Sequence, residues 1–329
     1  MRRRDFFRIL GMAVVSAPAL VRAQQSSVPV VAFLADGTPE GFAPRVAAVR
    51  RGLSDKGFIE GRDFILMSRW ARGNYDLLPG LVADLVRQQV SVIVTAGSEK
   101  VARAAKNGTA TIPIVATVAG DPVSRGLVTS VNRPGGNLTV VSLFTSSNNA
   151  LVAKRLELLH EVVPKIARIG WLVDANILDY DDQLHDLLRA AQTFGIEVKV
   201  ARVSKETDLE SAFATLIRDG ADAMLETGPV FYNNRERIVA LAASASAPIL
   251  YEWRTFVDEG GLMSYGSDIG EIFRQAGVYA SRILKGENVG DLPVVQQSRI
   301  ELIINLKTAK ALNLEIPPLL VARATEVIE

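Results

Sequence analysis

The segment Val92-Ile93-Val94-Thr95-Ala96-Gly97-Ser98 recurs, in altered form, as Ala223-Met224-Leu225-Glu226-Thr227-Gly228-Pro229. Each copy is an apolar run of strand length that ends in a loop containing glycine. A helix-like stretch precedes each copy at the same spacing, and a helix and a strand begun by proline follow each copy. For the first copy these flanking segments are Ala83–Val86 before it and Ile112–Val115 after it. For the second copy they are Ala214–Ile217 before it and Ala247–Leu250 after it. The repeat predicts two similar α/β lobes. The alternative, that any two strand-helix units look alike by chance, stays open at this level.

Apolar runs alternate with amphipathic stretches of helix length along nearly the whole chain. Continuous rather than alternating apolar strands indicate parallel sheets that helices cover on both faces. We therefore expect the α/β fold class with two doubly wound parallel-sheet lobes. The expected strands are Val28–Ala35, Phe64–Trp70, Val92–Thr95, Ile114–Val118, Leu138–Phe144, Arg168–Val173, Glu197–Arg202, Ala223–Glu226, Ile249–Tyr251, Leu262–Tyr265 and Ile300–Asn305.

The length also favours two lobes, because a chain of about 300 residues exceeds what one core usually organises. We expect an N-terminal lobe of residues 28–143 plus about 257–288, and a C-terminal lobe of residues 144–256 plus about 297–329. A hinge of three segments would join them. The three crossings are expected near Leu143–Ser146, Arg254–Gly260 and Val289–Gln296.

The first 23 residues have the three parts of a signal peptide. Arg2, Arg3 and Arg4 precede an apolar run from Ile9 to Val21, and Val21-Arg22-Ala23 provides a small-residue cleavage site. The run is too short to span a bilayer, and no later stretch is long and apolar enough to do so. Arg3-Arg4-Asp5-Phe6-Phe7 fits a twin-arginine signal, and an ordinary secretory signal with an arginine-rich start is the alternative. We expect a cleaved signal peptide over residues 1–23 and export to the periplasm.

Composition narrows the function further. The chain has no cysteine, which excludes disulfides, a thiol nucleophile, thiolate metal ligands and the lipidated cysteine of a lipoprotein. It has 37 basic and 36 acidic residues, and removal of residues 1–23 leaves 32 basic against 35 acidic ones. No basic face indicates a nucleic-acid partner.

The loops at the carboxyl ends of the strands are the expected binding site, because open parallel sheets bind ligands there. If the lobes face one another, these loops meet in a cleft that can close on a small molecule. In the first lobe, Ser98 begins a helix, where its hydroxyl and free N–H groups would suit a carboxylate, or it is a plain N-cap. Asp121 could accept from an ammonium or cap its own turn. The first-lobe candidates are Asp36, Thr95, Gly97, Ser98, Thr117 and Asp121.

In the second lobe, Glu252 lies between Tyr251 and Trp253 and could pair with an amine while the rings cover an apolar side chain. An exposed Glu-Trp-Arg loop is the alternative. Asp174 and Asn176 are either ligands or turn residues, and the ring of Tyr232 either contacts ligand or packs on the next helix. The second-lobe candidates are Asp174, Asn176, Gly228, Tyr232, Tyr251 and Glu252.

Catalytic motifs are missing from the sequence. The two histidines, His160 and His185, lie in expected helices without a partner motif. The chain has no nucleophile elbow, no P-loop, no dinucleotide-binding glycine pattern and no metal-ligand cluster. We expect neither an enzyme nor a cofactor. A sugar-responsive regulator with this fold would need a DNA-binding module at its amino end, which here is a signal peptide.

Several phrases, in order along essentially the whole chain, resemble the bacterial ABC-transporter substrate-binding proteins related to tryptophan and tyrosine receptors. The phrases are Arg51–Asp63, Gly120–Val128, Arg133–Thr139, Gly260–Gly266, Ile283–Gly286, Asp291–Val294 and Ile304–Lys310. One position departs from the family, since Val140 stands where relatives usually have glycine, near the first crossing.

The resemblance implies the type I periplasmic binding fold, with two lobes, three hinge crossings and a small-molecule ligand, such as an amino acid, delivered to an ABC permease in the inner membrane. It implies that the loop at Ser98 and the segment after Ile114–Thr117 hold the ligand carboxylate. Glu252 corresponds, by position, to an acidic residue near the ligand amine. Monomer is the default for this class. A receptor that docks on a membrane signalling protein is the alternative.

Overall fold

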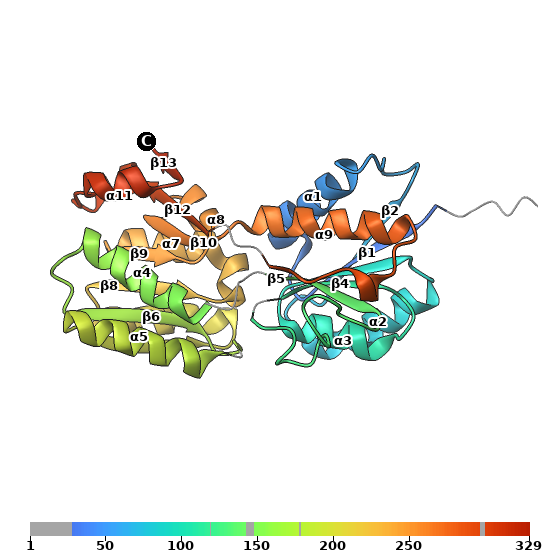
Figure 1. The fold of residues 1–329 in the computed structure, drawn as a ribbon. Helices are drawn as coiled ribbons and strands as arrows, with labels where there is room; N and C mark the ends of the chain where they lie inside the picture. The colour runs from blue at the N-terminus through green and yellow to red at the C-terminus, as the bar shows by residue number, and fades with distance from the viewer. Residues whose placement is uncertain (1–27, 119, 143–147, 178, 297–299) are drawn as a thin grey trace, which may run out of the picture.

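The computed structural model describes residues 28–118, 120–142, 148–177, 179–296 and 300–329, which form two α/β lobes side by side (Figure 1). The expected signal peptide at residues 1–23 and most of the first expected crossing, Leu143–Ser146, lie outside the described residues.

The first lobe is built on a six-stranded parallel sheet with the order β11-β5-β4-β3-β1-β2. Along β1, Val31 and Phe33 pack toward one helix layer, and Ala32 and Leu34 pack toward the other. Both faces of the sheet are therefore buried, as its continuous apolar strands predict. The strands are β1 Val30–Ala35, β2 Ile65–Trp70, β3 Val92–Ala96, β4 Ile114–Val118, β5 Leu138–Ser142 and β11 Val295–Gln296.

Two pairs of helices cover this sheet, α1 with α9 on one face and α2 with α3 on the other (Figure 1). The first pair packs backbone to backbone, since a Cβ atom on Gly52 would lie 1.9 Å from the carbonyl oxygen of Arg274. A side chain at Gly52 would therefore force the two helices apart. The helices are α1 Pro39–Ser54, α2 Leu78–Arg87, α3 Glu99–Gly108 and α9 Ile269–Leu284.

The second lobe has a seven-stranded sheet with the order β13-β12-β10-β9-β8-β6-β7. Helices α4 and α5 pack on one face, and α6 and α7 pack on the other. One pair, β10 with β12, is antiparallel, so this sheet is mixed rather than wholly parallel. The strands are β6 Arg168–Asp174, β7 Glu197–Val203, β8 Ala223–Thr227, β9 Ile249–Tyr251, β10 Met263–Ser267, β12 Ile300–Asn305 and β13 Glu326–Ile328. The helices are α4 Asn148–Val162, α5 Tyr180–Phe194, α6 Leu209–Arg218, α7 Arg235–Ser244, α8 Arg254–Asp258, α10 Leu306–Ala311 and α11 Pro318–Arg323.

The two sheets repeat one topology. The order β2-β1-β3-β4-β5 in the first lobe corresponds to β7-β6-β8-β9-β10 in the second. The repeated sequence segments are β3 and β8, and the strands begun by proline are β4 and β9. The repeat therefore marks equivalent strands, and the two lobes place the loops that follow those strands in equivalent positions.

Two expected crossings differ from the structure. The expected crossing at Arg254–Gly260 falls within and just after α8, and both α8 and β10 belong to the second lobe. The chain enters the first lobe later, at Asp268 between β10 and α9. The expected crossing at Val289–Gln296 is also too early, because β11 still pairs with β5 in the first sheet. No helix among the described residues is long and apolar enough to cross a membrane.

Candidate functional site

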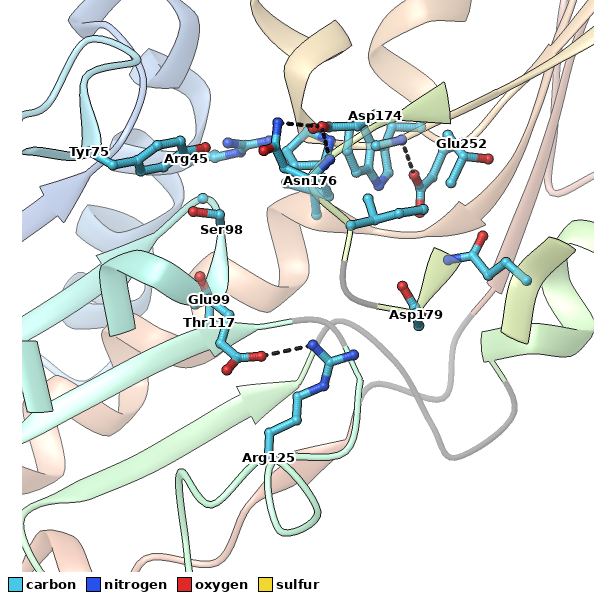
Figure 2. A pocket seen from close by; sticks show the side chains of 18 of the residues that line it. Arg45, Tyr75, Ser98, Glu99, Thr117, Arg125, Asp174, Asn176, Asp179 and Glu252 are labelled. Carbon is cyan, nitrogen blue, oxygen red and sulfur yellow. Dashed lines mark hydrogen bonds and ion pairs between the residues drawn. The ribbon is translucent and has the colours of Figure 1, made fainter. Parts of the chain in front are cut away.

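A pocket of about 110 Å³ lies between the lobes at the carboxyl ends of both sheets (Figure 2). Figure 2 shows Ser98 and the Glu99–Arg125 pair on one wall, and Asp174, Asp179 and Glu252 on the other. Seven of the twelve candidate residues line the pocket, and they come from both lobes. They are Gly97, Ser98, Thr117, Asp174, Asn176, Gly228 and Glu252.

On the first-lobe wall, a carboxylate shapes the loop that follows β3. The buried Asp36, which follows β1, accepts the N–H of Ser98 with its Oδ2 at 2.7 Å. Gly97 adopts φ of +104°, and a Cβ atom there would lie 1.9 Å from the Oδ1 of Asp36. Only glycine fits at this point. Burial raises the pKa of Asp36 above its usual value, although the backbone hydrogen bond from Ser98 lowers it. Asp36 thus lies behind the pocket wall and supports it.

The second-lobe wall repeats this arrangement. Asp174, at the end of β6, accepts the N–H of Val230 with its Oδ2 at 3.0 Å and the N–H of Asn176 with its Oδ1 at 2.8 Å. Gly228 adopts φ of +125°, and a Cβ atom there would lie 2.3 Å from that of Asp174. Unlike Asp36, Asp174 lines the pocket itself.

Helix α3 begins at the pocket, and its N-cap residue Ser98 makes no side-chain capping bond. The Ser98 hydroxyl has no hydrogen-bond partner within the described part of the chain. The carboxylate of Glu99 turns away from the first turn to pair with Arg125 at 2.8 Å and with Arg103. Two arginines thus compensate the acidic residue at the helix start. The N–H groups and the hydroxyl there can donate hydrogen bonds to an anionic oxygen.

The hydroxyl of Thr117 also lies on this wall, where it donates to the carbonyl oxygen of Thr95 at 2.8 Å. Thr95 itself is buried in β3 behind the wall and does not line the pocket.

Glu252 does not lie in an exposed loop, and its carboxylate is not free. Its side chain is buried, accepts the N–H of Gly228 at 3.1 Å and pairs with Arg155 at 3.4 Å. The N–H of Glu252 in turn donates to the buried carboxyl of Glu226 at 3.2 Å. Burial raises the pKa of Glu252, which Arg155 lowers in part, and burial together with the charge of Glu252 raises the pKa of Glu226 well above its usual value.

Three further candidates lie away from the pocket. Asp121 is exposed and accepts the N–H of Val123 at 2.9 Å, so it caps its own turn. Tyr251 is a core residue, because its ring stacks on Phe256 with the centroids 4.8 Å apart. Tyr232 is buried beneath Arg45, with the guanidinium carbon 3.7 Å from the ring centroid.

Comparisons with known proteins agree with this architecture. A family model described as ABC transporter substrate binding protein matches residues 27–328. The chain belongs to this family. A tyrosine-binding protein of Clostridioides difficile is 28% identical over 265 residues, which cover 80% of this chain and 75% of that protein.

Two solved structures are similar over 92% of this chain and 100% of theirs. One is a conserved domain protein from Vibrio cholerae O1 biovar eltor, with a TM-score of 0.80 and 27% identity. The other is an ABC domain from Streptococcus pneumonia in complex with L-Trp, with a TM-score of 0.80 and 22% identity. The expected type I periplasmic binding fold is confirmed. The matched family is one of substrate-binding proteins rather than enzymes.

For a substrate-binding protein, the most informative pocket residue that sequence analysis missed is Arg45. It is 4% exposed on α1, lies between the rings of Phe42 and Tyr232, and has no ion pair with a carboxylate among the described residues. Burial lowers its pKa. The sequence did contain an indication of this role, because Arg45 interrupts the apolar face of an amphipathic helix, where residues are normally apolar.

Other pocket residues that sequence analysis missed come from helix starts and from helix faces that carried no motif. They are Tyr75, Glu99, Arg125, Ile177, Asp179, Gln183, Ile269 and Phe273. Thr227 and Pro229 of the repeated loop and Trp253 beside Glu252, which the sequence did indicate, line the pocket as well. Burial raises the pKa of Tyr75 to about 12, so its hydroxyl stays a donor at neutral pH. No group of three or more potential metal ligands occurs in the described ranges.

Proposed function

We propose that this chain is the extracytoplasmic receptor of an ABC importer, and that its two lobes close on an amino acid with an apolar or aromatic side chain and pass it to a permease in the inner membrane. The family supports the transport role. The expected signal peptide supports a periplasmic location. The observation that carries the ligand class is the opposite polarity of the two pocket walls.

The first-lobe wall favours a carboxylate. The start of α3 offers N–H groups and the Ser98 hydroxyl, and the buried cation of Arg45 lies on the same wall. A helix N-terminus carries a partial positive charge, which favours a bound anion. Because Arg103 and Arg125 compensate the charge of Glu99, that residue does not cancel this preference.

The second-lobe wall favours an ammonium group. Asp174 and Asp179 both line it, and no hydrogen bond or ion pair of the Asp179 carboxylate occurs within the described residues. Glu252, the residue first expected to bind the amine, is already paired with Arg155. We therefore assign the ligand ammonium to Asp174 and Asp179, with Glu252 supporting the Gly228 loop behind them.

The rest of the pocket is apolar and aromatic, with Trp253, Phe273, Ile177 and Ile269 in its lining. Such a lining suits an apolar or aromatic side chain. The tyrosine-binding relative and the neighbour in complex with L-Trp support this class of ligand.

The test is a thermal-shift panel on the chain without residues 1–23, with amino acids, their des-amino analogues, sugars and nucleosides. A ligand that binds only the folded protein raises its melting temperature. We expect Ser98→Ala to weaken binding of amino acids and des-amino acids alike, by about tenfold. Asp179→Asn should weaken binding of the amino acids only. Ser244→Ala, on the exposed face of α7, is the matched control. Stabilisation by sugars alone would contradict the assignment, and turnover of a panel compound would contradict the receptor function.

A further inference from the structure

A second cavity, of about 180 Å³, lies next to the point where the chain crosses from β10 to α9. We call it the crossing cavity and define it by Arg45, Arg51, Trp253, Thr255, Asp268 and Gly270. Arg45, Trp253 and Ile269 line both this cavity and the ligand pocket, so their side chains form the wall between the two. The crossing cavity receives residues from α1 of the first lobe and from α8 of the second.

The crossing cavity is rich in hydrogen-bond donors. The indole Nε1 of Trp253, the Nε of Arg45 and the hydroxyl of Thr255 are buried and have no hydrogen-bond partner among the described residues. Trp253 is 6% exposed and Arg45 is 4% exposed. A buried donor without an acceptor costs about 1–3 kcal/mol, so three such donors in residues that line one cavity favour a bound acceptor.

Helix α9 adds backbone donors to the same cavity. It is 16 residues long and begins with Ile269 and Gly270, both of which line the cavity. The side chain of Asp268 caps the N–H of Glu271 at 3.0 Å, which leaves the first two N–H groups of the helix without an intrahelical partner. The positive end of the helix dipole therefore faces the cavity.

The charge balance selects an anion. Arg45 and Arg51 have no ion pair among the described residues, and Asp268, the one acidic residue in the lining, already caps the helix. A third arginine in the lining, Arg254, is paired with Asp258 and Glu326 and contributes no net charge. The positive end of α9 and the two arginines outweigh the single carboxylate of the lining, although Asp36 compensates part of the charge of Arg45.

We propose that the crossing cavity is a second binding site, separate from the ligand pocket, for a small oxyanion such as phosphate or a carboxylate. The anion would accept hydrogen bonds from the α9 N-terminus and from the Thr255 hydroxyl, and would pair with Arg51. Since the cavity is lined from both lobes, a bound anion would bridge them at the crossing.

The experiment is calorimetric titration of the chain without residues 1–23 with sodium phosphate, and separately with sodium acetate, at constant ionic strength set by chloride. We expect saturable binding of at least one of the two oxyanions at one site. Thr255→Val removes only the hydroxyl, and Arg51→Gln removes the charge, so each should weaken that binding by about tenfold.

Two controls separate this site from its surroundings. Arg50 lies on the same helix as Arg51 but outside the cavity, and it forms an exposed ion pair with Glu60. The Arg50→Gln protein should therefore bind the anion as the wild type does. Ser98→Ala alters the ligand pocket and should also leave anion binding unchanged. Absence of saturable binding, or equal binding by wild type, Thr255→Val and Arg51→Gln, would overturn the proposal. Loss of anion binding in Ser98→Ala alone would move the anion to the ligand pocket and would also overturn it.

Discussion

Replacing Glu226 with glutamine should change how the stability of the protein depends on pH. Glu226 is fully buried at the end of β8; its Oε2 accepts the N–H of Glu252, and its Oε1 has no partner among the described residues. Burial and the charge of Glu252 raise the pKa of Glu226 well above its usual value of 4.5. The folded protein therefore keeps this proton at pH values where the unfolded chain has released it.

The sign and the size of the effect follow from proton linkage. As the pH rises above 4.5, the unfolded state loses the proton and becomes relatively more stable, until the pH passes the folded pKa of Glu226. Each pH unit in that window lowers the free energy of unfolding of the wild type by up to about 1.4 kcal/mol. Glutamine is neutral in both states. Between pH 5 and pH 7, the stability of Glu226→Gln relative to wild type should therefore rise by up to about 3 kcal/mol.

The assay is urea unfolding of both proteins at pH 5, 6 and 7, followed by circular dichroism. The new amide can leave an N–H group without an acceptor, which costs about 1–3 kcal/mol at every pH. The slope of the difference with pH, rather than its absolute value, is therefore the test. Glu315→Gln, at an exposed position, is the control and should give a flat difference. Parallel stability curves for wild type and Glu226→Gln would refute the reasoning.

Three more substitutions test the close contacts. Gly97→Ala places a Cβ atom 1.9 Å from the Oδ1 of Asp36 at a φ of +104°. It should therefore lower the melting temperature and abolish the ligand-induced shift. A normal ligand response would contradict the assignment of the Gly97 loop to the wall of the ligand pocket. Gly52→Ala should destabilise the protein by at least about 2 kcal/mol in urea unfolding, because its Cβ atom would meet a carbonyl oxygen of α9 at 1.9 Å. Arg155→Met leaves the buried Glu252 unpaired and should cost about 3–5 kcal/mol at pH 7. Because burial raises the pKa of Glu252, lowering the pH toward 5 should favour its protonated form and reduce this loss; equal losses at pH 7 and pH 5 would count against this.

The strands and their equivalence between lobes were predictable because burial on both faces leaves a continuous apolar run in the sequence. The crossings were not predictable in the same way. The Arg254–Gly260 segment is polar enough for a linker, yet α8 occupies most of it, because Phe256 and Val257 pack into the core. Local polarity marks where the backbone reaches solvent, but it does not show which sheet the next strand joins.

Within the site, sequence reasoning succeeded where backbone position decides the role and failed where packing decides it. Gly97, Ser98 and Gly228 follow strands at equivalent places, so their position at the pocket could be predicted. Tyr251 also ends a strand, but its ring points into the core against Phe256, and the side on which a residue at a strand end projects depends on register. The partner of Glu252, Arg155, lies 97 positions earlier in the chain, on α4, and no local pattern joins the two.

The two pocket walls differ in polarity although the same aspartate–glycine arrangement forms both of them. In both lobes an aspartate after the first strand is packed against a glycine after the third, and its carboxylate accepts an N–H from the segment that follows. After Gly97 that segment is the α-helix α3, whose free N–H groups face the pocket. After Gly228 it is a 3₁₀ helix, Pro229–Asn234, whose first residue has no N–H, and Asp174 takes the N–H of Val230. The second copy therefore exposes an acidic side chain where the first exposes donors. Pro229 thus removes one N–H from the second wall, and this difference between the two copies underlies the proposed binding of a zwitterion.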